Sequence, residues 1–560
     1  MKFRLLKVDL SKNRIFKKDL DDRYIEEWIG GRGLGAKLLS EDNPRAEPFS
    51  AESSVFVLTS PMVGLLPSVN RVWFVSVSPL TGYYLCSSAG DFFAGELRKA
   101  GFDGIHITGK ARKPVYLSVI NGKTELHDAG SLWGKNTKEV TALLKKKHGG
   151  EVASIGIGGE NLVRFANVNV GVRQAGRGGI GAVLGFKKLK AIVVKGNQKI
   201  SFSENEKIKK LSQDSLREII KTGAGWKEKG TLELMEYVND ADIWPSYNWR
   251  KSHFDSDLYW KKFKKHIIGY HSCFNCPIGC GRYMKSRYGE GGDGPEYETI
   301  WAFGPECSND DADIVIQANH LCDLYGIDTI TTGNVIGWLM ECSQKGLVDY
   351  AFTNGEQILE LIGDIARREG IGDMLAEGTK RASGMVPGSE DFAINQAGME
   401  LPAYDPRGVW GMLLTYTFGP RHGCHLKAWT IGRELKMSVK DRTSVKGKAR
   451  MVSRMLDERA FLDSTCTCSF IDDDVVNRLT AKTMTILTGK KYTTKVLSGI
   501  GKRIVDLERR IDVLRGLKKS EDNLPKRIIE EQIMVGNKKI MVGKKNFEKM
   551  KREFYAIRGW

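Results

Sequence analysis

The sequence predicts an α+β fold, with a β-rich N-terminal domain followed by two mostly α-helical domains. Over the first 200 residues, short runs of β-branched and aromatic residues alternate with Gly, Pro, Asn and Asp turns. After Gly196 the chain becomes polar and helix-forming, and apolar residues then recur at helical spacing. We therefore divide the chain into residues 1–200, 201–395 and 396–560.

Individual elements follow from these patterns. Strands are predicted at residues 54–59, 72–77, 115–120 and 191–194, where the runs are rich in Val, Ile, Phe and Tyr. The segment 310–325 places Ile314, Ala318 and Leu321 on one helical stripe, and Gly326 is a suitable C-terminal stop. Further helices are predicted at residues 203–223, 446–463, 474–488 and 494–516.

Composition excludes several classes of protein. The 560 residues contain no apolar run of 18 residues, and the charged N-terminus lacks the apolar stretch of a secretory signal, so we expect a cytoplasmic protein without membrane insertion. The net charge of +18 favours acidic partners, but no nucleic-acid-binding motif accompanies it. Ten Cys are too few for a disulfide scaffold, and their clustering indicates a metal or redox site in a reducing compartment.

The most specific motif is the group Cys273, Cys276 and Cys280, in the spacing C-x2-C-x3-C. Three thiolates so spaced can bind one inorganic centre, and a fourth ligand would come from Cys466 or Cys468. Three buried thiols or a structural zinc site are alternatives, although zinc usually takes two local pairs of ligands. We favour a single four-iron cluster.

Two glycine-rich stretches suggest phosphate contacts. Residues 176–181 match GxGxxG, but a strand follows too soon and no acidic residue lies about 20 positions on, so we reject a Rossmann interpretation. Arg173 and Arg177, set among these glycines, can instead present guanidinium groups and amides to a phosphate. Residues 30–35 form a second such stretch, and a plain tight turn is the alternative for each.

Two acidic turns share one layout. Asp323 and Asp328 form D-x-x-G-x-D, and Asp463 with Cys468 forms D-x-x-x-x-C, each beginning near the end of a predicted helix. Two similar turns could bind two similar groups through carboxylate hydrogen bonds, and either one alone would be an ordinary helix end.

Together these segments resemble the tungsten-containing aldehyde:ferredoxin oxidoreductases, and the match runs nearly end to end. The segments that carry it are GGRGLGAKLL at 30–39, SPLTG at 78–82, RQAGRGGIGAVLGFKKLKAI at 173–192, CFNCPIGC at 273–280, GPEYETIWAFG at 294–304, QANHLCDLYGIDT at 317–329, LPAYDPRG at 401–408 and RHGCHLKA at 421–428. In that family two pterins hold one tungsten beside a four-iron cluster, so the resemblance implies that the N-terminal domain cradles a pterin.

The resemblance also implies site residues at matching positions. The cluster ligands would be Cys273, Cys276, Cys280 and Cys468. The contacts to a bis-pterin holding tungsten or molybdenum, with Mg between the pterin phosphates, would come from Arg71, Ser88, Gly90, Arg173, Gln174, Gly176, Asp323, Asp328, Lys427, Asp463 and Thr467.

Glu298 and His425 are the catalytic pair that the resemblance implies. Oxidation of an aldehyde to an acid consumes water and releases protons, which a carboxylate can accept and a His can shuttle. Glu296 and His422 are near-register competitors, and a surface carboxylate and a core imidazole are the plain alternatives. Ferredoxin or another acidic carrier would receive the electrons.

Five departures from the family pattern matter. Ser88 and Gln174 replace the usual Asn and Ala, and Cys466-Thr467 replaces Gly-Leu. Gln317 stands where the metal-bridged dimer has Glu, so we expect any homodimer to lack the bridging metal; the chain also stops short of the usual tail. Two alternatives remain: a catalytic subunit of a larger complex reducing an acid or aromatic thioester, and a non-catalytic cofactor-bearing subunit.

Overall fold

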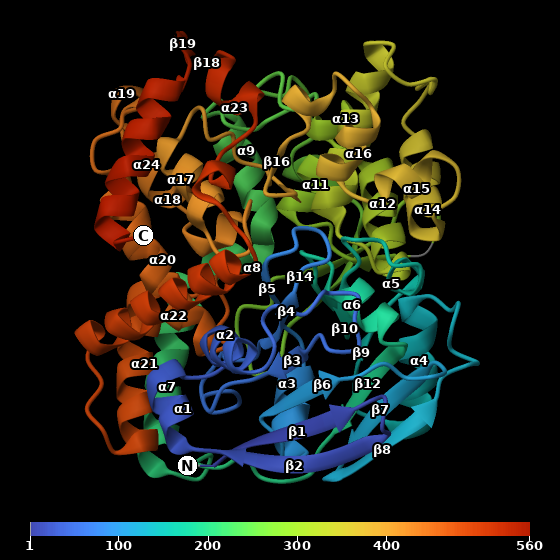
Figure 1. Cartoon of the computed structure of the whole chain (residues 1–560). Helices are drawn as coiled ribbons and strands as arrows, with labels where there is room; N and C mark the ends of the chain where they lie inside the picture. Colours follow the sequence, from blue (N-terminus) through green and yellow to red (C-terminus); the bar gives the residue numbers. More distant parts are fainter. Residues whose placement is uncertain (1, 290) are drawn as a thin grey trace.

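The structure is a computed structural model that describes residues 2–289 and 291–560. Figure 1 shows two β-sheets of the N-terminal region in the lower half and helices from the rest of the chain above and beside them. The first sheet has the strand order β2-β1-β6-β3-β4-β5, in which only β1 and β6 are parallel neighbours. Its strands are β1 (Phe3–Asp9), β2 (Arg14–Leu20), β3 (Val55–Leu58), β4 (Val72–Val77), β5 (Tyr84–Ala89) and β6 (Gly104–Thr108).

The second sheet has the order β11-β10-β9-β12-β7-β8, in which only β12 and β7 are parallel neighbours. Its strands are β7 (Val115–Ile120), β8 (Lys123–Asp128), β9 (Glu151–Ser154), β10 (Val168–Val170), β11 (Arg173–Ala175) and β12 (Leu189–Lys195). The helices of this region are α1 (Asp22–Trp28), α2 (Gly31–Glu41), α3 (Phe93–Lys99), α4 (Thr137–His148), α5 (Ile157–Glu160) and α6 (Ile180–Phe186).

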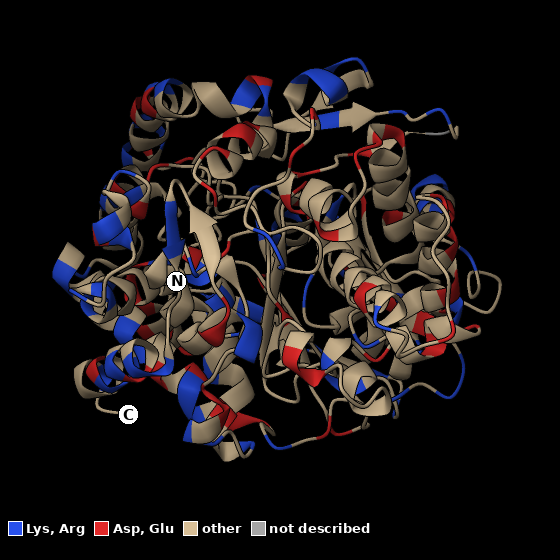
Figure 2. Cartoon of the chain, turned by 90° about the horizontal axis from the view of Figure 1, so that it is seen from above, with Lys and Arg blue, Asp and Glu red and all other residues tan. Residues whose placement is uncertain are grey.

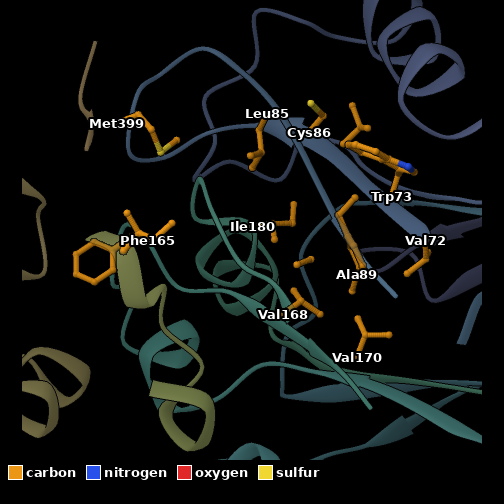
Figure 3. Packing of buried hydrophobic residues seen from close by; sticks show 14 of the residues in the cluster. Val72, Trp73, Leu85, Cys86, Ala89, Phe165, Val168, Val170, Ile180 and Met399 are labelled. Carbon is orange, nitrogen blue, oxygen red and sulfur yellow. The ribbon is translucent and has the colours of Figure 1, made fainter. Parts of the chain in front are cut away.

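The two sheets meet in one apolar core. Figure 3 shows Val72 and Ala89 of the first sheet close to Val168 and Val170 of the second, with Ile180 of α6 beside them. These side chains are almost fully buried. Because burial of an aliphatic side chain contributes about 1.5–3 kcal/mol, this contact fixes how the two sheets face each other and hence where β5 and β11, which carry predicted site residues, come to lie.

The remainder of the chain is mainly helical. Its helices are α7 (Glu206–Thr222), α8 (Ala224–Glu228), α9 (Leu234–Asn239), α10 (Trp260–Lys264), α11 (Tyr297–Phe303), α12 (Ala312–Tyr325), α13 (Thr329–Gln344), α14 (Gln357–Arg367), α15 (Ile371–Leu375), α16 (Thr379–Met385), α17 (Trp410–Phe418), α18 (Ile431–Glu434), α19 (Val439–Arg442), α20 (Lys448–Ser464), α21 (Asp473–Thr488), α22 (Thr494–Leu514), α23 (Lys526–Glu530) and α24 (Lys544–Arg558). Five short 3-10 helices also occur among the described residues: η1 (Gly230–Glu233), η2 (Pro305–Cys307), η3 (Glu390–Phe392), η4 (His425–Lys427) and η5 (Lys519–Glu521).

Three small sheets interrupt these helices. One contains β13 (Ile267–His271), β14 (Gly281–Met284) and β15 (Gly292–Asp293), in that order. The others are the pairs β16 (Asn395–Gln396) with β17 (Met399–Glu400), and β18 (Ile533–Val535) with β19 (Lys538–Ile540). The predicted fold class, a β-rich N-terminal region followed by helices, is confirmed, while the division at residue 395 stays a prediction.

The helix predicted at 310–325 shows how local sequence sets the boundaries. Asp311 caps the start of α12 by accepting a hydrogen bond from the amide of Asp313. Gly326 ends the helix with φ +70°, a conformation that favours glycine. Residues 30–35 differ from prediction, because they begin helix α2 rather than forming a phosphate-binding turn.

Charge lies mainly on the outer elements. Figure 2 shows Lys and Arg interspersed with Asp and Glu around the periphery, while most inner ribbons carry neither. Among the residues that the structure describes, none of the helices combines the length and the apolar character that crossing a bilayer requires.

Candidate functional site: a group of four cysteines and an acid–imidazole pair

The three clustered cysteines occupy the loop that joins β13 to β14. The amide of Cys276 donates to the carbonyl of Cys273 at 3.1 Å, which turns the loop tightly. Asn275 adopts φ +50° at the turn and donates from its side chain to the Leu66 carbonyl at 3.1 Å. The loop is therefore fixed against the N-terminal domain.

Ser68 connects this loop to the fourth predicted ligand. Its hydroxyl donates to Cys276 Sγ at 3.4 Å, and its carbonyl accepts from the amide of Cys468 at 2.9 Å. The Cys466 thiol lies against helix α2 instead, because an added Cβ on Gly31 would be 3.0 Å from its Sγ. One segment of the first domain thus brings together cysteines nearly 190 residues apart.

The cysteine thiols share one electrostatic environment. Burial raises the pKa of Cys273, Cys280 and Cys468. The charge of another cysteine of the group raises each of these pKa values further. Arg173 opposes the rise in all three, with Nη2 lying 3.8 Å from Cys280 Sγ. A nearby guanidinium stabilises thiolates, the form in which Cys binds metals.

The four predicted ligands are close enough to influence one another, which a polynuclear centre held by several cysteines requires. Throughout residues 2–289 and 291–560, no three or more His, Cys, Asp or Glu side chains are placed to hold one metal ion. In a four-iron cluster each Cys binds a different iron, so the sulfurs lie around the centre rather than at one point. Gly90 lies at the edge of this space, because an added Cβ there would be 2.9 Å from Cys273 Sγ.

The second acidic turn forms a buried network of charges. Asp463 Oδ2 accepts from Lys427 Nζ and from Arg32 Nη1, both at 3.0 Å. Arg32 also forms a bidentate pair with Glu508, at 2.7 and 2.8 Å. Burial alone would raise the pKa of Asp463, but Lys427 and Arg32 outweigh it and lower that pKa. The turn at Asp463 therefore carries a fixed negative charge.

Arg32 is a residue of this site that the sequence reasoning did not single out. It belongs to the glycine-rich stretch 30–35, for which the sequence predicts a phosphate contact. Its side chain is instead fully buried and paired with two carboxylates. Its partner Glu508 lies 476 positions further along the chain, and no motif links the two residues.

The first acidic turn differs from the second in the protonation of its carboxyl group. Burial and the neighbouring Asp293 raise the pKa of Asp323 well above its usual range, while Asn319 donates to its Oδ2 at 3.3 Å. Asp323 and Gln174 border a cavity of about 310 Å³. A neutral carboxyl group can both donate and accept hydrogen bonds, which suits the edge of a heterocycle that carries an amine and a carbonyl.

Asp328 has a different environment from Asp323. It caps α13, accepting from the amides of Ile330 and Thr331, and it pairs with Arg177 Nε at 3.3 Å. An added Cβ on Gly176 would lie 3.8 Å from its Oδ1. Arg177, expected to face a phosphate, is buried and committed to this carboxylate and to two backbone carbonyls.

The remaining predicted pterin contacts are spread between the two sheets and the cysteine centre. Arg71 donates to the hydroxyl and carbonyl of Ser88 at 3.0 and 3.2 Å, so these two residues lie together. Arg173 forms ion pairs with Asp293 at 3.0 Å and Glu296 at 2.8 Å. Thr467 is buried, and its hydroxyl lies 2.6 Å from that of Thr465.

Glu298 and His425 lie together, as the resemblance implied. Glu298 Oε1 is 3.4 Å from His425 Nε2, and Glu298 Oε2 accepts from the amide of Ala403 at 3.0 Å. Oε1 of Glu298 and Nδ1 of His425 are buried without a hydrogen-bond partner. Buried polar atoms are normally satisfied, so two unsatisfied atoms indicate a place for reacting groups.

The environment shifts both groups towards neutrality. Burial raises the pKa of Glu298 to about 8. Burial, aided by Arg177 and Arg421, lowers the pKa of His425 well below its usual range. A carboxyl group with a pKa near the working pH can exchange protons in either direction.

The competing pair is engaged elsewhere. Glu296 accepts from Arg173 and from Thr231. His422 contacts Gln396 Oε1 at 2.8 Å and Asp512 Oδ2 at 3.4 Å. Glu296 is thus committed to two donors, whereas His422 keeps Nε2 without a hydrogen-bond partner although Asp512 lies 3.4 Å away.

Cys424 is a second feature that sequence reasoning underrated. It is buried, as the core interpretation predicted, but Arg421 Nη2 lies 2.8 Å from its Sγ. Burial would raise the pKa of this thiol, but Arg421, Lys427 and Arg177 outweigh it and lower that pKa. A positively charged environment thus surrounds the chain segment that carries His425.

Comparisons with known proteins identify the class first: both parts of the chain match models of an oxidoreductase family. Residues 5–196 match the aldehyde ferredoxin oxidoreductase N-terminal domain, and residues 207–560 match its domains 2 and 3. The chain belongs to the aldehyde ferredoxin oxidoreductase family, which confirms the resemblance.

Several relatives share the whole length of the chain. The tungsten-containing aldehyde ferredoxin oxidoreductase of Pyrococcus abyssi is 37% identical, with 100% of this chain and 96% of the relative covered. The aliphatic sulfonate oxidoreductase WOR-like subunit of Pyrococcus furiosus is 29% identical, over 93% of this chain and 89% of the relative. The active-site complex BamBC of benzoyl coenzyme A reductase has the same fold, with a TM-score of 0.87 at 24% identity over 100% of this chain and 95% of that one.

Proposed function

We propose that this chain is a tungsten or molybdenum bis-pterin enzyme that oxidises aldehydes to carboxylic acids with water and passes the electrons through one four-iron cluster to ferredoxin. The observation that carries the proposal is the pair Glu298 and His425, 3.4 Å apart, with one buried atom on each that has no hydrogen-bond partner. The names of the relatives at 35–37% identity, which specify tungsten and aldehydes, support it.

The chain offers residues suited to both cofactors. Cys273, Cys276, Cys280 and Cys468 would hold the cluster. Asp323 and Asp463 would contact the two pterins, with Arg71 and Arg173 near the cluster side and Mg between the pterin phosphates. When bound, the pterin-held metal would supply a two-electron acceptor and the cluster a one-electron relay.

Proton handling falls to the acid–imidazole pair. Conversion of an aldehyde and water to an acid releases two electrons and two protons. In its ionised form, Glu298 accepts a proton from the water molecule while the oxygen of that water bonds to the carbonyl carbon of the aldehyde. His425 is neutral, so a ring N–H can hydrogen-bond the carbonyl oxygen without adding charge to an already cationic environment.

Aromatic side chains surround the imidazole of the pair. The aromatic ring of Tyr404 lies 5.5 Å from that of His425, and it in turn packs on Tyr297 and Trp429. These buried rings favour an apolar or aromatic substituent on the aldehyde.

Metal analysis combined with one substitution tests the proposal. Anaerobically purified protein should contain about one W or Mo and four Fe per chain and reduce benzyl viologen with an aldehyde. Glu298→Gln should retain these metals and lose turnover. Unchanged turnover would remove Glu298 from the mechanism; metal-loaded protein that reduces an acid or a thioester, or that has no turnover, would support the alternative roles.

A further inference from the structure

The loop that holds three cysteines is the end of an exposed hairpin. β13 is an edge strand, bonded only to β14 within its sheet, and its last residue, His271, is two positions before Cys273. Along β13, Ile268 and Tyr270 alternate outwards and are 63% and 59% exposed. Large apolar side chains so exposed, on a strand with a free edge, are typical of a contact surface.

The other end of the hairpin is strongly basic. Lys261, Lys264 and Lys265 are exposed on α10 and the turn that leads into β13. Lys285 is also exposed, and its amide donates to the carbonyl of His266 at 3.0 Å, which places it beside the start of β13.

Several acidic side chains at this end are paired with nearby cations. Lys262 binds Asp257, and Arg287 binds Asp311 at 2.8 Å and Asp313 at 3.4 Å. Lys264 lies 4.0 Å from Glu228, so the positive charge beyond these local pairs comes from Lys261, Lys265 and Lys285.

We propose that this hairpin face, defined by Ile268 and Tyr270 with Lys261, Lys264, Lys265 and Lys285, is the docking surface for a small acidic iron–sulfur electron carrier. The inference rests on the proposed function and names the surface at which the electrons from aldehyde oxidation leave the protein. The five residues of β13 span about 17 Å at 3.3 Å per residue, so a small carrier can cover the apolar strand and the basic end together. The acidic charge of the carrier complements the lysines and guides its approach. The small apolar area at Ile268 and Tyr270 orients the carrier without binding it tightly.

A charge reversal tests this surface. Lys265→Glu/Lys285→Glu should lower kcat/KM for a small acidic two-cluster ferredoxin about tenfold at low salt, because steering by charge acts on association. The difference should shrink above about 0.3 M salt, where the Debye length falls well below 10 Å. Tyr270→Ala should lower kcat/KM at both salt concentrations, and benzyl viologen reduction should be unchanged in both variants.

The control carries the same charge change on a different face. Lys538→Glu/Lys539→Glu lies on β19, which Figure 1 places far above β14. Equal losses in the control and the hairpin variants, or no loss in the hairpin variants, would overturn the docking surface.

A binding measurement separates this inference from the proposed function. Immobilised oxidised ferredoxin should bind the wild-type holoenzyme and the β19 control alike, and the hairpin variant about tenfold more weakly, whether or not an aldehyde is oxidised. Absence of aldehyde-dependent viologen reduction would refute the proposed function alone. A tightly bound partner subunit that co-purifies and covers Tyr270 would refute the carrier surface.

Discussion

Replacing Glu298 by Gln should raise the stability of the cofactor-free protein while it abolishes turnover of the loaded enzyme. The substitution keeps the shape of the side chain, and the Gln carbonyl can still accept from the amide of Ala403. The Gln amide can donate to His425 Nε2, which lies 3.4 Å from Glu298 Oε1 in the wild-type protein. The variant removes a carboxyl group whose ionised form is destabilised by burial.

The size of the gain follows from the pKa of Glu298. A rise from 4.5 to about 8, at about 1.4 kcal/mol per unit, gives an upper bound of about 5 kcal/mol. Because 16% of the side chain is exposed, solvent reduces this penalty, and we expect about 3 kcal/mol.

The pH dependence has a definite sign. Below pH 4 the carboxyl group is protonated in both states, so the two proteins should differ little. Between pH 4.5 and 8 the unfolded chain loses the proton first, so the free energy of unfolding of the wild-type protein falls relative to the variant; above pH 8 the difference is constant.

Urea unfolding of both cofactor-free proteins at pH 4, 6 and 9 measures this difference directly. Glu508→Gln is a matched control, because its carboxylate is paired with Arg32; weakening that buried pair should instead destabilise the protein by about 3 kcal/mol. A difference between Glu298→Gln and wild type that did not change with pH, or a loss of stability at pH 9, would refute the assignment of a raised pKa.

Three further outcomes follow from the same geometry. The kcat/KM for aldehyde oxidation should rise with pH to a plateau above about 8, since Glu298 must ionise to accept a proton; a pH-independent rate would contradict this. Iron analysis should show loss of the cluster in Cys468→Ser and retention in Cys466→Ser; equal iron in both would exclude the predicted ligand set. Gly90→Ala should lower iron content, because its new Cβ would lie 2.9 Å from a ligand sulfur. Gly384→Ala, which meets nothing within 4 Å, should leave iron content unchanged.

The fold class could be predicted because its elements are marked locally. The segment 310–326 carries its periodicity, cap and stop in seventeen residues, and α12 forms at Ala312–Tyr325. The glycine-rich stretch at residues 30–35 was misread because glycine usually disfavours helices. Packing overrides that preference: an added Cβ on Gly33 or Gly35 would lie within 2.5 Å of a neighbouring side-chain atom.

Those parts of the candidate site that lie within one short segment of the chain could be predicted, and the contacts between distant segments could not. The spacing of Cys273, Cys276 and Cys280 indicated a metal centre without any alignment, whereas Cys468 was separated from Cys466 only through the family resemblance. The pairing of Glu298 with His425 joins α11 to η4, 127 positions apart, and no local pattern signals it. The buried pair of Arg32 and Glu508 could not be found for the same reason, because charge complementarity between distant segments is visible only after packing.

These long-range contacts have a consequence for assembly. Ser68 of the N-terminal region contacts Cys276 from the helical region and the amide of Cys468 from the C-terminal part. Arg32 likewise holds Asp463 at 3.0 Å. The predicted ligands therefore converge only when all three parts of the chain have packed together. A group that binds the four cysteines binds the packed state in preference to the open one, so it must stabilise the contacts between these parts by its own binding energy. Binding of such a group would thus be coupled to docking of the C-terminal helices onto the sheets, where Ser68 and Arg32 make the contacts between the parts.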